Sequence, residues 1–589
     1  ISVTKKSVST GAISLGTDSN LGDITVENLD VDGDGQEGSI AFGSDQFRHS
    51  NSLANDLFSV KFDGTYLLDE HTIEFGVKYD VLDIENQFLP GSKDIISFNS
   101  LEDFEDQIAS SYSYSNGTGN NPAAVIAKFS REDIAFYIND TWYYSDDLIL
   151  SAGLRYERLG SDDKPTYNEG LESRTGFSNT NNLDGVDILL PRVGFTYTLN
   201  EDVTLRGSAG RYAGGNPNVW ISNSYSNDGI SSQSFSERGI ALPSNALNNP
   251  IDEAIAAVNS GTQGSPSNFI DPNFETPSQW TFMLNSDVNL DIPYLGEGFA
   301  WTTTAIYTKK ENTAEWINAA LLQDGDVVGS TIDGALPFYD TRELEIMLTN
   351  ADDNGRSIIL STGISKSWEN GFKFDASYTN QDITDGNPGS SSTARSNYRY
   401  GHFGDHQQTQ VGVSPYETEH RFVVNLGYTA EFIDNYKTKF NLFIERNSGS
   451  AYSQLSSLEN LTGGRFFDQD LIQPSGFGST FGGNYLAYVP TANDPNVIYA
   501  DGVNEADVLA HFEQLGLSGS AGGFAERSQG KTPWVTTMDL YVSQEIPGFA
   551  DDHRGEFYFV IDNLLNLIDS SKGKVYRQDN NSRSVIELD

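Results

Sequence analysis

The stretch LLDEHTIEFGVKYDVLD (67–83) contains the pattern that decides the fold. The polar pair Asp69-Glu70 interrupts two apolar runs, and after it apolar and polar residues alternate. Because successive side chains of a strand point to opposite faces, this stretch predicts a tight turn followed by a strand with one apolar and one polar face. The apolar face would hold Ile73, Phe75, Val77, Tyr79 and Val81, and the polar face Glu74, Lys78 and Asp80.

The same period of two recurs along most of the chain. In LILSAGLRYE (148–157), for example, Leu150 and Leu154 alternate with Ser151 and Arg155. A soluble antiparallel sheet also alternates, so one strand alone does not identify a membrane protein. Counting such segments predicts roughly 15–17 strands. The clearest lie at about 55–69, 71–85, 131–145, 148–159, 188–199, 202–213, 277–290, 298–310, 357–368, 371–381, 417–431, 436–447, 532–546 and 554–565.

The connections between these segments are of two kinds, short turns and long polar loops. The short turns are Asp69-Glu70, Ser145–Asp147, Asn200-Glu201, Glu369-Asn370 and Ile433–Asn435. The long connections run at about 86–131, 160–187, 214–276, 382–416 and 447–531. Bacterial outer-membrane barrels have this asymmetry, because their short turns face the periplasm and their long loops face outside. The chain therefore predicts an all-β, transmembrane antiparallel β-barrel with long extracellular loops.

Composition agrees with a membrane β-barrel. Hydrophobic residues make up 37% of 589 residues and mean hydropathy is -0.42. No run approaches the roughly 20 apolar residues of a membrane helix, which a barrel strand does not need. Aromatic residues make up 12%, with 28 Tyr and 34 Phe, as interfacial girdles require, and Trp142, Trp280, Trp301 and Trp534 suit such girdles. The chain has no cysteine, which excludes disulfides and thiolate metal sites.

The charge of the chain is extreme. Asp and Glu total 83 against 36 Lys and Arg, which gives a net charge of -47. Nucleic-acid binding requires a basic surface, so this balance argues against it. The acidic residues form a solvated surface suited to a salty habitat, or they gather divalent cations or steer a cationic ligand.

Two segments within the long connections have the pattern of short helices. IDEAIAAV (251–258) has Asp252 near its start, and NEADVLAHFEQL (504–515) begins with Asn504. Asp and Asn are favoured at the beginning of a helix. The sequence therefore predicts that these loops carry one short helix each.

Several blocks resemble TonB-dependent outer-membrane receptors. REDIAFYINDTW (131–142), followed by residues 148–157, is similar to a block that recurs in the middle of these barrels, f-Y-x-x-D-x-W … L-x-L-x-x-G-L-R-Y. The most specific match, RGSAGRYAGGNPNVWISNSYSNDG, resembles the Oar-like branch, the OmpA-related receptors that often carry a carboxypeptidase-regulatory-like domain. The remaining matches lie at 190–199, 420–432 and 557–569.

This resemblance implies a 22-stranded barrel preceded by a signal peptide, a TonB box and a plug. The sequence has no legible signal peptide at Ile1, and its end, SVIELD, is not the aromatic-terminated strand usual for such barrels. We therefore expect residues 1–589 to be a barrel domain with its loops, lacking the signal peptide, the plug, the first strands and the C-terminal strand. The unpaired backbone groups of a bare strand edge are too costly in lipid. We therefore expect the missing strands to be supplied by a segment outside residues 1–589.

A candidate calcium loop begins at Asp30. Carboxylates at Asp30, Asp32 and Asp34 are followed by Gly35, as in the D-x-D-x-D-G opening of calcium loops. The closing glutamate is missing, because position 12 of the loop is Ala41, and Glu37 or Asp45 would have to substitute. The segment predicts a calcium site, with a plain acidic turn as the alternative.

The sequence HFGDH (402–406) places two histidines and a carboxylate close together. Such groups can bind zinc, but the neighbouring glycines favour an ordinary exposed loop. The chain has no G-x-S-x-G elbow and no Walker motif, since Gly530-Lys531-Thr532 lacks the upstream glycine. These patterns do not indicate an enzyme.

Substrate-binding residues are expected in the long loops. Aromatic rings offer stacking surfaces, and amides offer hydrogen bonds, so we take as candidates Asn216, Asn218, Trp220, Tyr225, Asn227, Tyr398 and Tyr400. The alternative for each aromatic residue is packing between loops or a place in the outer girdle.

Three functions follow from these patterns. The resemblance implies a TonB-dependent transporter that takes up a substrate, such as a peptide or an oligosaccharide, with the TonB complex as partner. The strand count also permits a passive pore of about 16 strands. The third is a surface-binding or adhesion protein anchored by its barrel. Each would lie in the outer membrane of a Gram-negative bacterium, in contact with lipid and lipopolysaccharide.

Overall fold

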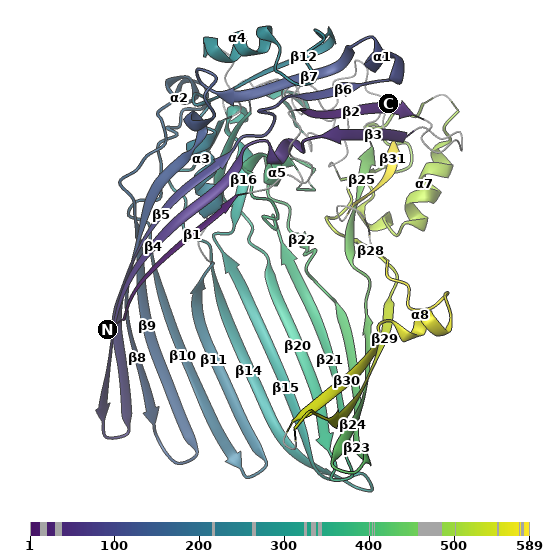
Figure 1. Ribbon diagram of the computed structural model, residues 1–589. Helices are drawn as coiled ribbons and strands as arrows, with labels where there is room; N and C mark the ends of the chain where they lie inside the picture. Colours follow the sequence, from purple (N-terminus) through teal and green to yellow (C-terminus); the bar gives the residue numbers. More distant parts are fainter. Residues whose placement is uncertain are drawn as a thin grey trace.

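A long curved sheet forms the wall of the molecule, and smaller sheets and short helices form a cap at one end of it (Figure 1). The computed structural model describes residues 2–11, 21–29, 38–214, 218–261, 267–322, 327–330, 337–339, 344–399, 401–402, 404–405, 407–457, 486–500, 502–550, 553–576, 578 and 582–587.

The wall is a 16-stranded sheet in which all paired strands are antiparallel. In spatial order its strands are β1 (Ser2–Gly11), β4 (Asn51–Leu68), β5 (His71–Phe88), β8 (Ala127–Tyr143), β9 (Leu148–Gly160), β10 (Asp187–Asn200), β11 (Val203–Ala213), β14 (Ser278–Ile292), β15 (Gly296–Glu311), β20 (Arg356–Ser367), β21 (Phe372–Asp385), β23 (His420–Ile433), β24 (Tyr436–Asn447), β29 (Val535–Pro547) and β30 (Arg554–Ile561), with β22 (Gly412–Val413) beside β21.

The sequence prediction of the wall is confirmed. Each of the clearest predicted segments coincides with one of the strands from β4 to β30, and the sheet has the expected number of strands. Among the described residues no pairing joins β1 to β30, so this sheet has two edges. A segment that pairs with these edges is needed to close the sheet into a barrel.

The short turns lie together at one end of the wall, as predicted, and the long loops lie at the other (Figure 1). Tight turns favour residues that tolerate the left-handed backbone conformation, and two of the predicted turns use it. Asp69 joins β4 to β5 with φ 48°, and Asn435 joins β23 to β24 with φ 67°. Trp142 and Trp301 lie toward the short turns, and Trp280 and Trp534 lie toward the long loops, as two girdles require.

The two faces of the wall differ in chemistry. Direct cross-strand partners share a face, and Phe75, Ile138 and Leu154 form one such row, in which each side chain is between 41% and 52% exposed. The opposite face carries polar residues and, toward the long loops, Ile84 and Phe129, which are buried against the cap. The cap therefore covers the polar face, which is the inside of the barrel, and the bare apolar face is the outside.

The cap is built from five small sheets. A five-stranded sheet contains β12 (Ser232–Ala241), β7 (Ile108–Gly117), β6 (Ile95–Phe98), β2 (Asp23–Leu29) and β3 (Gly38–Gly43). The other four contain β13 (Ser267–Ile270), β19 (Glu345–Asn350) and β16 (Ala314–Asn318); β17 (Val327–Ser330) and β18 (Pro337–Tyr339); β28 (Gly530–Lys531), β25 (Ala451–Ser457) and β31 (Ser582–Glu587); and β26 (Tyr488–Val489) and β27 (Gly523–Phe524).

The helices of the described residues are all short and lie in the connections. The α-helices are α1 (Leu101–Glu105), α2 (Glu169–Thr175), α3 (Asn218–Ser226), α4 (Asp252–Ser260), α5 (Ala394–Arg399), α7 (Glu505–Gln514) and α8 (Leu564–Ile568). The 3-10 helices are η1 (Gln46–Arg48), η2 (Pro122–Val125), η3 (Ala319–Leu321) and η4 (Ser518–Ser520).

Both predicted loop helices are confirmed. Asn504 caps α7 by accepting a hydrogen bond from the backbone N–H of Ala506, and Asp252 lies in the first turn of α4. Over the described part of the chain, no helix has the length and apolarity needed to cross a membrane.

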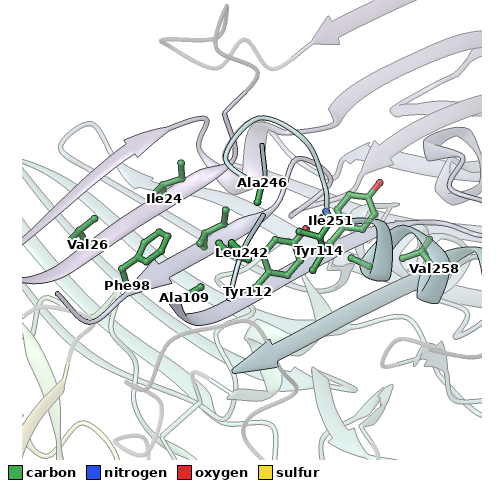
Figure 2. Close-up of a cluster of buried hydrophobic side chains, with 12 residues drawn as sticks. Ile24, Val26, Phe98, Ala109, Tyr112, Tyr114, Leu242, Ala246, Ile251 and Val258 are labelled. Carbon is green, nitrogen blue, oxygen red and sulfur yellow. Dashed lines mark hydrogen bonds between the residues drawn. The ribbon is translucent and has the colours of Figure 1, made fainter. Parts of the chain in front are cut away.

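The five-stranded sheet has a hydrophobic core of its own. Figure 2 shows this core, in which Ile24, Phe98 and Tyr112 of the sheet pack with Ile251 and Val258 from the α4 region. A second core joins the cap to the wall, because Ile84 and Phe129 of the wall pack with Ile221 of α3 and Trp316 of β16. The cap is therefore a packed structure seated on the inner face of the wall.

Candidate functional site beneath the cap

A pocket of about 290 Å³ lies between the inner wall and the cap. Strands β5, β8 and β9 contribute charged side chains, and the loops contribute Leu183, Phe274 and Pro277. The charged side chains that line it from the inner face are Lys78, Asp80, Asp133, Arg155 and Glu157, whereas Arg158 lies on the strand face of Leu154, outside the barrel. Two are cationic and three are anionic, and Asp133 is paired with Arg131, so the pocket is polar and carries little net charge.

The charges of this pocket are arranged as pairs along each strand. Residues two apart share a face, and Lys78 Nζ lies 2.5 Å from Asp80 Oδ2, while Arg155 Nε lies 2.5 Å from Glu157 Oε1. Ser59 Oγ on β4 also donates to Asp80 Oδ1 at 2.6 Å. Such charge-assisted pairs place donors and acceptors of both signs on the inner face.

Tyr137 of β8 connects the charged strands of the pocket to β4. The Tyr137 hydroxyl donates to Asp63 on β4, two strands away, because its ring lies across Gly76 of β5. A Cβ at Gly76 would lie only 2.3 Å from the Tyr137 hydroxyl oxygen, so no other residue fits there without displacing the ring. The Arg155 guanidinium lies over the same ring, 5.6 Å from its centroid.

Arg131 links the wall to the cap. Its side chain is 3% exposed, its Nε donates to Asp133 Oδ1 at 3.0 Å, and its Nη1 donates to Asn218 Oδ1. Asn218 is the first residue of α3, so this contact anchors the helix above the pocket. The predicted binding residue Asn218 is thus in direct contact with the charged wall.

The predicted aromatic residues pack within the cap. The Tyr225 ring stacks on Phe129 of the wall at 4.7 Å, and its hydroxyl donates to the Asp163 carbonyl at 2.8 Å. Burial raises the pKa of Tyr225. Trp220 Nε1 donates to the Ser391 carbonyl at 3.1 Å, and Tyr398 is buried in the same core.

The structure brings Trp220, Tyr225 and Tyr398 together, but in the core that joins cap and wall. Asn227 lies at the end of α3, where its carbonyl accepts a hydrogen bond from the Asn268 N–H at 2.7 Å. Asn216 and Tyr400 lie outside the described residues. Direct contact of these candidates with a substrate stays a prediction.

The structure describes only some of the residues of the predicted metal sites. Asp30, Asp32, Asp34 and Glu37 all lie outside the described residues, so the calcium site stays a prediction. Asp45 is described, and its Oδ1 caps η1 by accepting from the Phe47 N–H at 2.8 Å. Within the described ranges no group of three or more His, Asp or Glu residues could hold a metal ion.

The expectation of an exposed loop at 402–406 is wrong for His402 and Asp405, which are both buried. His402 Nδ1 lies 2.8 Å from Ser453 Oγ. Burial and the nearby Arg527 cation lower the pKa of His402 to about 4, so its ring is neutral at pH 7. His406 lies outside the described residues.

Sequence reasoning missed two structural centres of the cap. One is Glu315-Trp316, where Trp316 is 1% exposed and Glu315 Oε1 accepts a hydrogen bond from Asn387 Nδ2 at 2.8 Å. Burial raises the pKa of Glu315. The other is the buried ion pair of Arg527 with Asp385, at 2.8 Å. In the sequence, the apolar residues next to Trp316 indicate that this segment is buried. No such pattern next to Arg527 indicates that its side chain is buried.

A buried carboxyl group makes the five-stranded sheet sensitive to pH. Asp94 is 1% exposed, and its Oδ1 accepts a hydrogen bond from the Tyr112 hydroxyl, which in turn accepts one from the Ile251 N–H at 3.1 Å. Burial raises the pKa of Asp94 to about 7. A raised carboxyl pKa means that the folded state binds the proton more tightly than the unfolded state, so stability falls as pH rises from about 4 to about 7.

We expect Asp94→Asn to remove this dependence. Between pH 5 and pH 8 the wild-type sheet should lose about 3 kcal/mol that the variant keeps, because the amide stays neutral. Hydrogen exchange of the β6 and β7 amides at the two pH values measures the difference. Burial lowers the pKa of His49, so the titration of His49 makes stability rise with pH. This contribution is the same in the wild type and in Asp94→Asn, so it cancels when the two proteins are compared. Equal pH dependence in the two proteins would contradict the assignment.

The profile of the family described as "Outer membrane beta barrel domain" matches residues 4–569. No curated protein matches. Among solved structures, the outer membrane transporter YddB from Escherichia coli is 10% identical with a TM-score of 0.47, over 96% of this chain and 56% of that one. The copper transporter OprC is 11% identical with a TM-score of 0.40, over 88% and 52%. This chain thus spans about half the length of these two proteins.

Proposed function

Because the chain belongs to the family of outer membrane beta barrel domains, we propose that it is the wall and the outer mouth of a receptor that takes a solute through the outer membrane of a Gram-negative bacterium. The observation that carries this proposal is the pocket between the cap and the charged inner wall. It lies under the long loops, where a solute from outside first meets the lumen.

The chemistry of the pocket supports a polar solute with no large net charge. Its ion pairs offer donors and acceptors of both signs, and Phe274 and Pro277 add apolar surface. A peptide or an oligosaccharide has these features. The resemblance to TonB-dependent receptors supports energy coupling through TonB and through a plug supplied by a segment outside this chain.

The packed cap distinguishes this proposal from a passive pore. Ile84 and Phe129 at the mouth of the wall are buried under α3, and Arg131 is bonded to the first residue of that helix. A pore that conducts steadily requires a water-filled mouth. A mouth covered by a folded cap supports capture followed by gated passage.

Uptake of labelled peptide and oligosaccharide pools by cells with and without TonB tests the proposal. We expect uptake that requires TonB and that falls roughly tenfold in the charge-neutral double variant Arg155→Gln/Glu157→Gln, since charge-assisted hydrogen bonds to the solute are lost. The matched control is Arg206→Gln/Asp287→Asn, another inner ion pair, which lies near the short turns. Steady ion conductance with TonB-independent uptake would favour a pore, and binding without uptake would favour a surface-binding protein.

A further inference from the structure

The outer face of the wall carries a row of three cations and a tryptophan. Arg211 of β11 pairs directly with Trp280 of β14, Trp280 with Lys309 of β15, and Lys309 with Arg356 of β20. Direct partners of antiparallel strands share a face, so these four side chains form one continuous row. With neighbouring strands roughly 4.8 Å apart, the row is about 14 Å long.

Neighbouring residues establish which face this is. Lys310, the residue after Lys309, is directed inward, because its Nζ donates to the Thr384 carbonyl at 2.9 Å, near the cap-covered end of β21. Lys309 therefore lies on the outside, where its side chain is 60% exposed. All four residues lie within a few positions of the long loops, which places the row at the outer-leaflet end of the wall.

Directly below the cationic row, the outer face has an apolar hollow of about 810 Å³. The hollow exists because small residues, Gly207, Ala209 and Ala305, occupy positions between larger ones. Its larger lining residues on the outer face include Val193, Phe195, Phe282, Leu284, Tyr307 and Leu360. Phe282 and Tyr307 are the partners one step below Trp280 and Lys309, so the hollow and the row are continuous.

Carboxylates neutralise the row only in part. Glu311 lies 3.5 Å from Arg211 and 3.2 Å from Lys309, and Asp382 lies 2.9 Å from Arg356. Arg211 Nη2 also donates to Ser278 Oγ at 3.1 Å. Three cations against two anions leave this patch positive, on a chain whose net charge is -47. The Lys309 and Arg356 side chains are 60% and 52% exposed, so their donors are accessible.

We propose that the row and the hollow form a binding site for lipopolysaccharide, with its lipid phosphates on the cations and an acyl chain in the hollow. Phosphate oxygens accept charge-assisted hydrogen bonds from Lys and Arg, and basic clusters at the membrane surface bind anionic head groups. An apolar hollow on a lipid-facing surface is filled by hydrocarbon. This inference depends on the membrane location and not on the proposed transport.

Titration of the purified whole chain in detergent with bis-phosphorylated lipid A, followed by native mass spectrometry, tests the site. We expect Lys309→Gln/Arg356→Gln to weaken binding about tenfold or more, since two charged contacts are lost. The matched control is Lys128→Gln/Arg446→Gln, which removes two cations from the same face and end of the wall, away from the hollow, and should change binding by less than about twofold.

Two further measurements make the test specific. Ala305→Phe fills the hollow without altering charge, and it should weaken lipid A binding by roughly fivefold or more, as loss of acyl-chain burial requires. Unchanged mobility of the unheated variants in gels shows that they are folded. Equal weakening by the two double variants, or equally tight binding of dephosphorylated lipid A or of phosphatidylglycerol, would overturn the assignment to lipopolysaccharide.

Discussion

Replacing Arg527 by methionine is expected to release the part of the cap formed by residues 486–500 and 502–531 from the wall. The Arg527 and Asp385 side chains are only 4% and 10% exposed, and Arg527 Nη1 donates both to the carboxylate and to the backbone carbonyl of Asp385. Removing one partner of a buried pair leaves an uncompensated charge and typically costs about 3–5 kcal/mol. Hydrogen exchange at Val489, Phe512 and Leu517, in the core of that segment, should accelerate roughly 100-fold or more.

Two variants isolate the ion pair as the cause. In Arg527→Met/Asp385→Leu the isolated charge is gone, so most of the protection should return. Arg554→Gln removes an ion pair with Glu545 near the short turns, where Arg554 is 56% exposed, and it should leave exchange in the cap unchanged. Unaltered protection in the methionine variant would mean that the pair does not hold the segment.

The second large effect is expected at Trp316. Its side chain is 1% exposed, and its ring meets that of Trp220 edge to face at 4.8 Å. Truncating a buried tryptophan to alanine costs about 3–5 kcal/mol, through lost burial and the cavity left behind. We therefore expect Trp316→Ala to open β16, β19 and α3 to hydrogen exchange while the wall strands stay protected.

A double-mutant cycle with Trp220→Ala measures the contact between the two rings. Aromatic pairs of this geometry contribute about 1 kcal/mol beyond their burial, so the two substitutions should be less than additive by that amount. Trp301→Ala is the control, because that residue lies on the outer face of the wall near the short turns. Exchange spreading equally to the wall would contradict a separately stabilised cap.

Local residues were sufficient to predict the wall strands from β4 to β30, whereas β1 and the two-residue β22 were not among the clearest predicted segments. In residues 67–83 the alternation and the Asp69-Glu70 turn are visible without knowledge of any other segment, and the same holds for the other predicted strands. The predicted helices at 251–258 and 504–515 also depend on their own periodicity and first-turn residues. Such features follow from steric rules that act between near neighbours in the chain.

The candidate site was only partly predictable. Asn218, Trp220 and Tyr225 lie in the predicted long connection 214–276, but on a helix, α3, that was not predicted. Their partners, Arg131, Trp316 and Phe129, come from other segments. Polar residues of a loop have no periodicity, so their sequence does not reveal which of them are buried. The position of His402 shows this, since a glycine-containing polar segment is folded inward against Ser453.

The sequence by itself determined the period-two wall, its tight turns and its outer-membrane character, because these depend on short-range alternation between apolar and polar residues. Only the tertiary structure decided the pocket, the ion pair between residues 142 positions apart at Asp385 and Arg527, and the cationic row across β11, β14, β15 and β20. Those features depend on strand register and loop packing, which bring together residues whose own neighbours carry no sign of the contact.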